Sequence, residues 1–295
     1  MSTGPRRSDW IKRLVLTLSI LVAFVFLFIT CYKAPVTGRS QLILLPEEQV
    51  AQIGVTTFQQ VLEEEKLSQN PEYNEALRVV GSRIVRVSDT PNYNWDYRVI
   101  EDDDTINAFA LPGGKIGVYT GILPVAKNHA GLATVMGHEV AHVAARHGAE
   151  RMTAGLLAQL GAAGIGIALR NQDPDVVNAV MQAFGIGVTV GGIIPFTRTQ
   201  EVEADKIGLI YMAKAGYDPR EAPDFWMRMG EATKDMPRPP EFLATHPNYG
   251  TRAETLRNML PQAMYYYERS SKAPNYLIAS DVKEVKRLKI ASSGD

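Results

Sequence analysis

Two histidines and a glutamate, His138, Glu139 and His142, form an HExxH pattern. On a helix, residues four apart lie about 40° apart around the axis, so His138 and His142 share one face. Two imidazoles placed in this way can hold one Zn²⁺ ion. Glu139 lies beside that face, where it can act as a general base toward a water molecule on the metal. The pattern predicts a metal-dependent hydrolytic site, against the plainer alternative of a buried helix with two hydrogen-bonded histidines.

A catalytic metal on two histidines needs a third protein ligand and an open position, and Glu201 is the candidate. Glu201 and Asp205 share a helix face, so Asp205 can accept a hydrogen bond from the outer N–H of a ligand histidine. Glu203 lies about 200° around the helix from Glu201 and should point away. His147, about 140° around the helix from His142, is excluded from the same metal.

Composition limits the classes of function. The chain has 295 residues, a net charge of −1 and 21% charged residues. No basic excess exists to meet phosphates, which argues against nucleic acid as a partner. The single cysteine, Cys31, excludes an intrachain disulfide and a cysteine-based zinc site. A bound metal must therefore use histidine and carboxylate ligands.

An unbroken apolar run occupies residues 14–29, after a basic segment at residues 1–13. A helix of this length spans about 24 Å, slightly less than the hydrocarbon core of about 30 Å. Basic residues before the run predict that the N-terminus stays in the cytoplasm and the rest is exported. We therefore expect a membrane-anchored protein of the cell envelope, with its catalytic domain in the periplasm or otherwise outside the cytoplasmic membrane.

The end of the apolar run, Phe-Ile-Thr-Cys31, resembles a bacterial lipobox, in which the cysteine is lipidated. Thr30 stands where lipoproteins usually carry Gly, Ala or Ser. Two alternatives therefore stay open, a lipoprotein modified at Cys31 and an uncleaved signal anchor. Both assign residues 1–31 to a membrane tether.

Beyond the tether, residues 32–45 predict a short linker. Residues 46–87 carry apolar side chains at helical spacing. Tyr97–Ile100 predicts a strand, and the acidic run Glu101–Asp104 predicts a turn. We interpret that run as a solvated loop in preference to a calcium site, because charge runs are usually exposed.

Residues 107–123 predict a β-hairpin beside the metal helix. Pro112-Gly113-Gly114 is a tight-turn signal, and the residues after it alternate as in a strand. We expect the second strand to run along the front of the metal helix, where an edge strand can pair with a substrate backbone. An ordinary structural hairpin is the equal alternative. The substrate-binding candidates on that strand are Lys115, Ile116, Gly117 and Val118.

Residues 154–194 form an apolar tract rich in glycine. Small residues let helices approach closely, as in a membrane-associated hairpin. Because the tract is weakly hydrophobic for a membrane span, we interpret it as a soluble helical hairpin that could form a lid beside the active site.

Taken together, these motifs resemble peptidase family M48, the gluzincins. The resemblance rests on HExxH followed by Glu-x-x-Ala-Asp205, on Asn107-Ala-Phe before Pro-Gly-Gly, on Arg198-x-x-Glu201, and on Thr245-His-Pro before Arg252. The segment from Cys31 to Arg39 is similar to that of the lipoprotein members. The match covers roughly residues 31–260.

The resemblance implies a mainly helical α+β fold, a zincin-like domain with a small antiparallel sheet or hairpin beside the HExxH helix. It places the metallopeptidase domain at residues 46–264 and a tail at 265–295, in the branch without a helical-repeat domain. It implies one Zn²⁺ per chain and zinc endopeptidase activity.

Two further residues receive roles with alternatives. By resemblance, His246 would occupy the fourth position of the zinc and keep the enzyme latent, or bind the transition-state oxyanion; a structural loop histidine is the plainer alternative. Arg252 would neutralise a carboxylate or steady the oxyanion, against the alternative of a surface salt bridge.

The resulting hypothesis is peptide hydrolysis by Zn²⁺ on His138, His142 and Glu201, with Glu139 as general base. Family and location imply extended or misfolded envelope proteins as substrates. The alternative is a latent, chaperone-like zinc protein that binds unfolded envelope proteins and rarely cleaves them. The sequence leaves the physiological substrate and the oligomeric state open.

Overall fold

The computed structural model describes residues 17, 31–90, 92–169, 197–234 and 249–278, with side chains except at 159–169 and 249–251. The apolar run at 14–29, apart from residue 17, lies outside this part, as do His246 and the second half of the glycine-rich tract. Within the described part, no helix combines the length and the hydropathy needed to cross a membrane.

The described chain is mainly helical with two small sheets, which confirms the expected α+β class. The strands are β1 (Cys31–Lys33), β2 (Ser40–Leu42), β3 (Asp96–Ile100), β4 (Ala108–Leu111) and β5 (Lys115–Tyr119). The first helices are α2 (Glu47–Glu64), α3 (Pro71–Arg86), the short 3₁₀ turn η1 (Thr120–Ile122) and α4 (Leu123–Ala126). The later helices are α5 (His129–Ala144), α6 (His147–Leu169), α8 (Arg198–Lys214), α9 (Glu221–Thr233) and α11 (Tyr249–Arg269).

Helices α2 and α3 occupy the segment that was expected to be helical, and a cap separates them. The side chain of Asn70 accepts hydrogen bonds from the backbone N–H groups of Glu72 and Tyr73, and Pro71 starts α3. The first N–H groups of a helix have no acceptor within the helix. The asparagine side chain accepts hydrogen bonds from two of them, and proline in the first turn has no N–H that needs a partner. Asn70 and Pro71 therefore mark the start of the second helix.

The larger sheet has the strand order β3-β5-β4. Strands β4 and β5 form the expected antiparallel hairpin, and Gly113 and Gly114 in its turn both have a φ of +79°. Glycine adopts such left-handed angles without a steric penalty. The sheet also contains a parallel pair, because β3 lies alongside β5.

The expectation that β5 offers a free edge to substrate is wrong. Strand β5 is the central strand, with β3 on one side and β4 on the other, so Lys115, Ile116, Gly117 and Val118 are all buried in the sheet. The ammonium of Lys115 donates a hydrogen bond to the carbonyl of Asn94, a structural contact. Among the described strands, β4 is the edge strand beside the metal helix.

The segment expected to be a linker contains a folded hairpin. Strands β1 and β2 pair antiparallel and dock on the C-terminal end of α5. The hydroxyl of Tyr32 donates to the carbonyl of Ala144 (2.9 Å), and the amide of Gln41 donates to that of Ala145 (2.9 Å). These bonds satisfy carbonyl groups that have no partner within the helix. We call residues 31–42 the N-terminal hairpin.

The described part of the expected C-terminal tail also belongs to the folded body. Helix α11 continues to Arg269, and the chain then returns to the start of α5. The backbone N–H of His129 donates to the carbonyl of Tyr276 (3.0 Å), and that of Ile278 donates to Lys127 (2.9 Å). The boundary expected at residue 264 therefore cuts through a packed helix.

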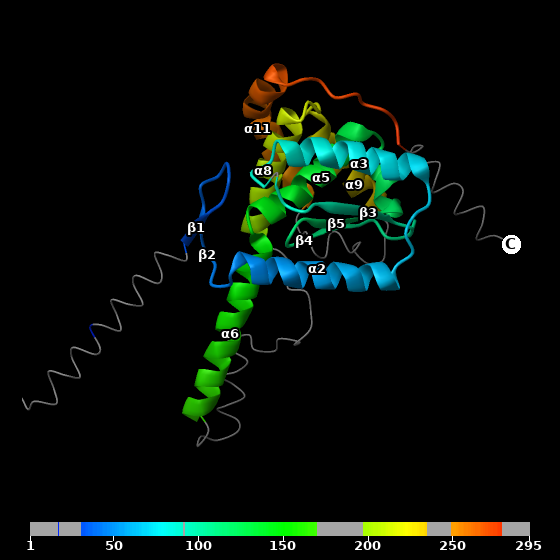
Figure 1. The fold of residues 1–295 in the computed structure, drawn as a ribbon. Helices are drawn as coiled ribbons and strands as arrows, with labels where there is room; N and C mark the ends of the chain where they lie inside the picture. The colour runs from blue at the N-terminus through cyan, green and yellow to red at the C-terminus, as the bar shows by residue number, and fades with distance from the viewer. Residues whose placement is uncertain (1–16, 18–30, 91, 170–196, 235–248, 279–295) are drawn as a thin grey trace, which may run out of the picture.

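Helix α5, which carries the HExxH residues, is the centre of the structure. Every one of its residues is buried. It packs against α3, α8 and α9 and against strand β4, while α2 lies beyond the sheet (Figure 1). A helix enclosed on all sides should be apolar all around, as the sequence of α5 is. The three polar residues of the motif are thus held in an apolar core.

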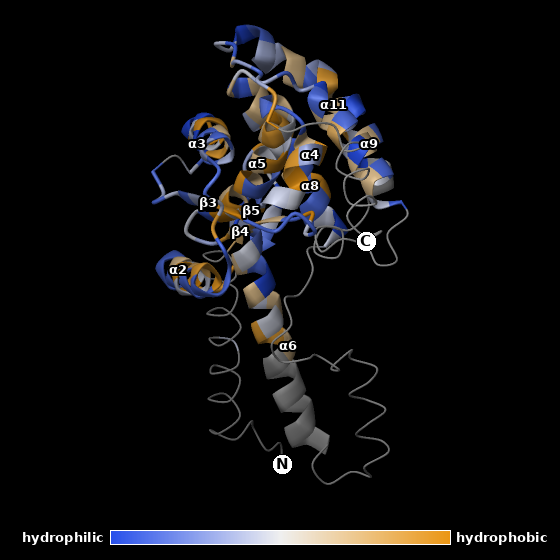
Figure 2. Ribbon diagram, turned by 90° about the vertical axis from the view of Figure 1, so that its right-hand side faces the viewer, coloured by the Kyte–Doolittle hydropathy of each residue, from blue (hydrophilic) through white to orange (hydrophobic). Residues whose placement is uncertain are grey.

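The path of the chain changes after α5. Arg146 has a φ of +55°, and the following helix α6 leads away from the body (Figure 2). Leu156 and Leu157 on α6 are exposed. The described part of the glycine-rich tract is therefore helical; the remainder lies outside the described residues.

Candidate metal centre

Two glycines set the distance between the helices that carry the metal-binding residues. A Cβ atom built on Gly208 of α8 would lie 2.7 Å from the backbone carbon of Gly137 of α5, and one on Gly137 would lie 2.8 Å from the carbonyl oxygen of Gly208. Cβ atoms do not tolerate such distances. The two backbones touch here, and this contact brings Glu201 and Asp205 of α8 to His138 and His142 of α5.

Replacing Gly208 by alanine is expected to lower the free energy of unfolding by about 1–3 kcal/mol, because the methyl group must push two helix backbones apart. Thermal and urea unfolding of the metal-free protein measure this. Gly81→Ala in α3 is the matched control: its Cβ meets only side-chain atoms of Met136 and Tyr97, the nearest at 3.2 Å. Equal effects of the two substitutions would contradict the assigned role of Gly208.

Three buried side chains converge at the crossing of α5 and α8. The Nε2 atoms of His138 and His142 lie 3.0 Å apart. The carboxylate of Glu201 lies 3.5 Å from Nε2 of His138 and 3.3 Å from Nε2 of His142. Among the described residues, these three form the one group with ligand atoms close enough for a shared metal ion.

This geometry fits a zinc ion. Ligand atoms about 2.1 Å from a tetrahedral ion lie about 3.4 Å from one another. Burial, and next His138, lower the pKa of His142 well below its usual value, so its imidazole is in the neutral form that binds metals. Three ligands of the types His, His and Glu leave one position open, as in catalytic zinc sites.

Glu139 lies beside these ligands and is fully buried. Burial, and then the charge of Glu201, raise the pKa of its carboxyl well above the usual range. The backbone of Ala110, on the edge strand β4, lies near this carboxylate and opposes the rise of its pKa. A carboxylate whose pKa is raised is a stronger base than an exposed one, which suits a group that must take a proton from water.

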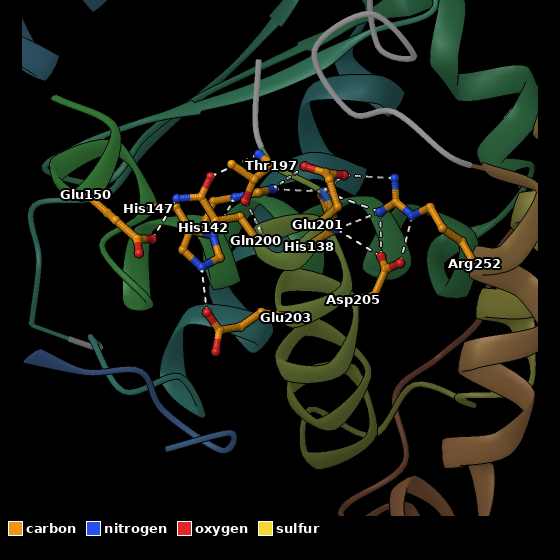
Figure 3. A network of polar contacts seen from close by, with 10 residues as sticks. All are labelled: His138, His142, His147, Glu150, Thr197, Gln200, Glu201, Glu203, Asp205 and Arg252. Atoms are coloured by element: carbon orange, nitrogen blue, oxygen red, sulfur yellow. Dashed lines mark hydrogen bonds and ion pairs between the residues drawn. The ribbon is translucent and has the colours of Figure 1, made fainter. Parts of the chain in front are cut away.

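Asp205 and Arg252 form a network of polar contacts with His138 and Glu201 (Figure 3). Asp205 Oδ1 lies 3.0 Å from Nδ1 of His138. The guanidinium of Arg252 donates from Nε to Asp205 Oδ2 (2.7 Å) and lies 3.1 Å from Glu201 Oε2. Although burial alone would raise the pKa of Asp205, Arg252 and His138 hold it below its usual value. Of the two roles expected for Arg252, these contacts match the neutralisation of carboxylates.

A second network of polar contacts joins His142 to His147 and Glu203. Neither His147 nor Glu203 was predicted from the sequence to belong to the site. His147 Nδ1 lies 2.8 Å from Nδ1 of His142, and its Nε2 lies 3.0 Å from Glu203 Oε2. Burial raises the pKa of Glu203, but hydrogen bonds from His147, Thr37 and Arg39 outweigh it and lower that pKa to about 2. Glu203 is therefore ionised and accepts these bonds.

The angle that excluded His147 as a ligand assumed one continuous helix. Helix α5 ends at Ala144, and the left-handed backbone of Arg146 turns the chain before His147 begins α6. This turn places His147 behind His142. The available signal was a third histidine directly after the motif, together with a second acid two residues beyond Glu201.

A small pocket opens beside the metal centre. It lies between α2, the turn of the β4–β5 hairpin and the junction of α5 with α6, and its lining includes Glu47, Ala110, Pro112 and His142. The outer edge of β4 and a metal ligand therefore face the same space.

Three other predictions concern His246, Cys31 and the acidic run at residues 101–104. His246 lies outside the described residues. Cys31 is exposed at the start of β1. Asp102 of the acidic run accepts hydrogen bonds from the backbone N–H groups of Asp104 (2.9 Å) and Thr105 (3.2 Å), which favours the loop interpretation over a calcium site.

Comparison with known proteins gives consistent matches. The sequence model of Peptidase family M48 matches residues 71–260. The mitochondrial metalloendopeptidase OMA1 of Schizosaccharomyces pombe is 38% identical over 190 residues, which cover 64% of this chain and 53% of the relative. The Bos taurus protein of the same name is 33% identical over 281 residues, covering 88% of this chain and 51% of the relative.

A bacterial relative matches as well. A putative beta-barrel assembly-enhancing protease of Vibrio cholerae is 33% identical over 185 residues, covering 60% of this chain and 37% of the relative. The chain spans about half the length of the two OMA1 relatives and less of this one.

Proposed function

The chain belongs to peptidase family M48, and from this premise we propose that it is a zinc-dependent metalloendopeptidase. One observation carries the proposal: three buried ligand atoms of His138, His142 and Glu201 converge, with the Glu139 carboxylate beside them. This is the arrangement that metal-assisted hydrolysis requires. The names of the relatives, which describe metalloendopeptidases and a protease, support the same activity.

Each residue has a role in the proposed reaction. A zinc ion bound to the three ligands would polarise the scissile carbonyl and lower the pKa of the attacking water. Glu139 would take a proton from that water and deliver it to the nitrogen of the leaving amine. Asp205 would orient His138 by accepting the proton of its Nδ1.

The substrate would bind in extended form along the outer edge of β4. This edge is unpaired with any described strand, and Ala110 on it lines the same pocket as the metal ligand His142. An added strand is held mainly by backbone hydrogen bonds, which any peptide can make. Side chains of the substrate would enter the pocket beside His142. Such a site favours unfolded or extended proteins over folded ones.

The N-terminal sequence and one relative support the cellular setting that we propose. The apolar run and Cys31 support tethering to a membrane of the cell envelope, with the catalytic domain outside the cytoplasm. The Vibrio cholerae relative is named for beta-barrel assembly. We therefore propose misfolded or misassembled envelope proteins as the substrates, with no role for nucleic acid.

Casein cleavage by the purified full chain tests the activity. We expect zinc-loaded protein to cleave casein, a strong zinc chelator to abolish cleavage, and added Zn²⁺ to restore it. Cleavage that persists after the metal has been removed would contradict the proposal. A chain that holds one zinc and binds unfolded casein without cutting it would instead match the chaperone-like alternative.

A further inference from the structure

Both ring nitrogens of His142 have a partner. Nε2 faces the metal-binding cluster, and Nδ1 lies 2.8 Å from Nδ1 of His147. The second nitrogen of His147 lies 3.0 Å from a carboxylate oxygen of Glu203. Figure 3 shows His147 between His142 and Glu203, on the side opposite Asp205 and Arg252. All three residues of this chain of contacts are buried.

The metal fixes the direction of these hydrogen bonds. When Nε2 of His142 is a ligand, the proton of the neutral ring is on Nδ1, which donates to Nδ1 of His147. The proton of His147 is then on Nε2, which donates to Glu203. Each donor in this arrangement faces an acceptor, so the chain of bonds holds the ring plane of His142 in one orientation.

The N-terminal hairpin provides the other partners of Glu203. Arg39 donates from Nε to Glu203 Oε2 (2.6 Å), and the hydroxyl of Thr37 donates to the other oxygen. The remaining nitrogens of Arg39 bind Glu150 at the start of α6 in a bidentate pair (2.7 and 2.8 Å). Gln200 donates to the same carboxylate of Glu150 (2.6 Å). The hairpin thus joins α6, α8 and the metal centre.

The backbone of the hairpin turn is strained in a way that suits these contacts. Val36 has a φ of +62° and is 47% exposed. A β-branched residue rarely adopts a left-handed conformation, and burial of this exposed side chain does not offset the strain. The turn places Thr37 and Arg39 on Glu203. Strain of this kind is kept where surrounding contacts determine the conformation.

We propose that His147 is a positioning residue for the metal ligand His142, and that Arg39 of the N-terminal hairpin holds it in place through Glu203. The inference rests on the proposed function, because it concerns the same metal centre. It makes tight metal binding dependent on a docked N-terminal hairpin. The hairpin begins at Cys31, the last residue of the expected membrane tether.

A pair of substitutions with the same shape tests His147. His147→Leu removes both hydrogen bonds, whereas His147→Asn keeps an acceptor near the position of Nδ1. For the full chain in detergent, competition with a chromophoric chelator measures zinc affinity at fixed pH. We expect His147→Leu to weaken zinc binding about 10–100-fold and His147→Asn to recover part of the loss. Equal affinities of the Leu variant and the wild type would overturn the proposal.

A second pair tests the link to the hairpin. Arg39→Met keeps the length of the side chain and removes its hydrogen bonds to Glu203 and Glu150. The control is Arg78→Met, which removes an exposed arginine paired with Glu75 on α3. We expect Arg39→Met to weaken zinc binding about three- to tenfold and Arg78→Met to leave it unchanged. Equal zinc affinities of the two variants would overturn the role of the hairpin.

Two measurements separate positioning from general destabilisation. The visible spectrum of the Co²⁺-substituted protein reports ligand geometry, and we expect its bands to change in His147→Leu and to move back toward the wild type in His147→Asn. Metal-free unfolding shows whether each variant folds. An unchanged spectrum in a folded Leu variant would contradict the proposal. Because zinc affinity is measured without turnover, a failure of casein cleavage would count against the proposed function alone.

Discussion

Replacing Glu139 by glutamine is expected to lower the rate of casein cleavage about 10²- to 10⁴-fold while leaving zinc bound. Glutamine has the shape of glutamate but cannot accept a proton from water. The side chain is fully buried, and burial together with the charge of Glu201 raises the pKa of the carboxyl. A neutral amide avoids both unfavourable effects. The metal-free variant should therefore be as stable as the wild type or more stable.

The control for this substitution is Glu72→Gln, at an exposed position in the first turn of α3. It makes the same chemical change far from the metal helix and should leave cleavage unchanged. Initial rates at equal zinc content, together with urea unfolding, distinguish a lost base from a lost fold. Wild-type cleavage by the Glu139 variant would refute the proposed mechanism.

Replacing Arg252 by methionine is expected to lower the free energy of unfolding of the metal-free protein by about 3–5 kcal/mol. The guanidinium is 2% exposed and lies against the carboxylates of Asp205 and Glu201. It also stacks on Trp226, with its central carbon 3.5 Å from the ring centroid. Methionine keeps much of this packing, so the loss reports mainly two buried carboxylates left without a cation. Urea unfolding measures it.

Zinc should reduce this effect, because a bound dication neutralises the charge of Glu201. The stability difference between variant and wild type is therefore expected to be smaller in the zinc-loaded protein. Arg220→Met, which breaks an exposed pair with Asp218, should change stability by less than about 1 kcal/mol. If Arg252 steadied the oxyanion instead, its variant would lose kcat without losing stability.

The sheet shows which part of the fold the sequence could not predict. The hairpin was predicted correctly, because Pro112-Gly113-Gly114 is a local turn signal. The position of β5 within the sheet was not. Its neighbour β3 lies earlier in the chain. The alternation of residues within one strand does not indicate which distant strand it pairs with. Burial of β5 on both edges follows from that pairing, which moves the proposed substrate edge to β4.

The N-terminal hairpin shows a similar limit. Residues 32–45 were expected to form a linker, because Pro35 and Gly38 within them interrupt regular structure. The contacts that order this segment, from Tyr32, Arg39 and Gln41, all reach residues more than a hundred positions away. A short hairpin is only marginally stable alone. Here its contacts with the end of α5 and with Glu203 stabilise it.

The residues that can bind the metal are predictable from the sequence alone. His138 and His142, and likewise Glu201 and Asp205, are pairs within one helix, and the helical repeat alone places the members of each pair on one face. How the pairs meet depends on packing, through the contact of Gly137 with Gly208. The same holds for the contacts of Arg252 with two carboxylates and of His147 with His142. These contacts join separate elements, so they depend on packing and on the turn at Arg146, which no helical period contains.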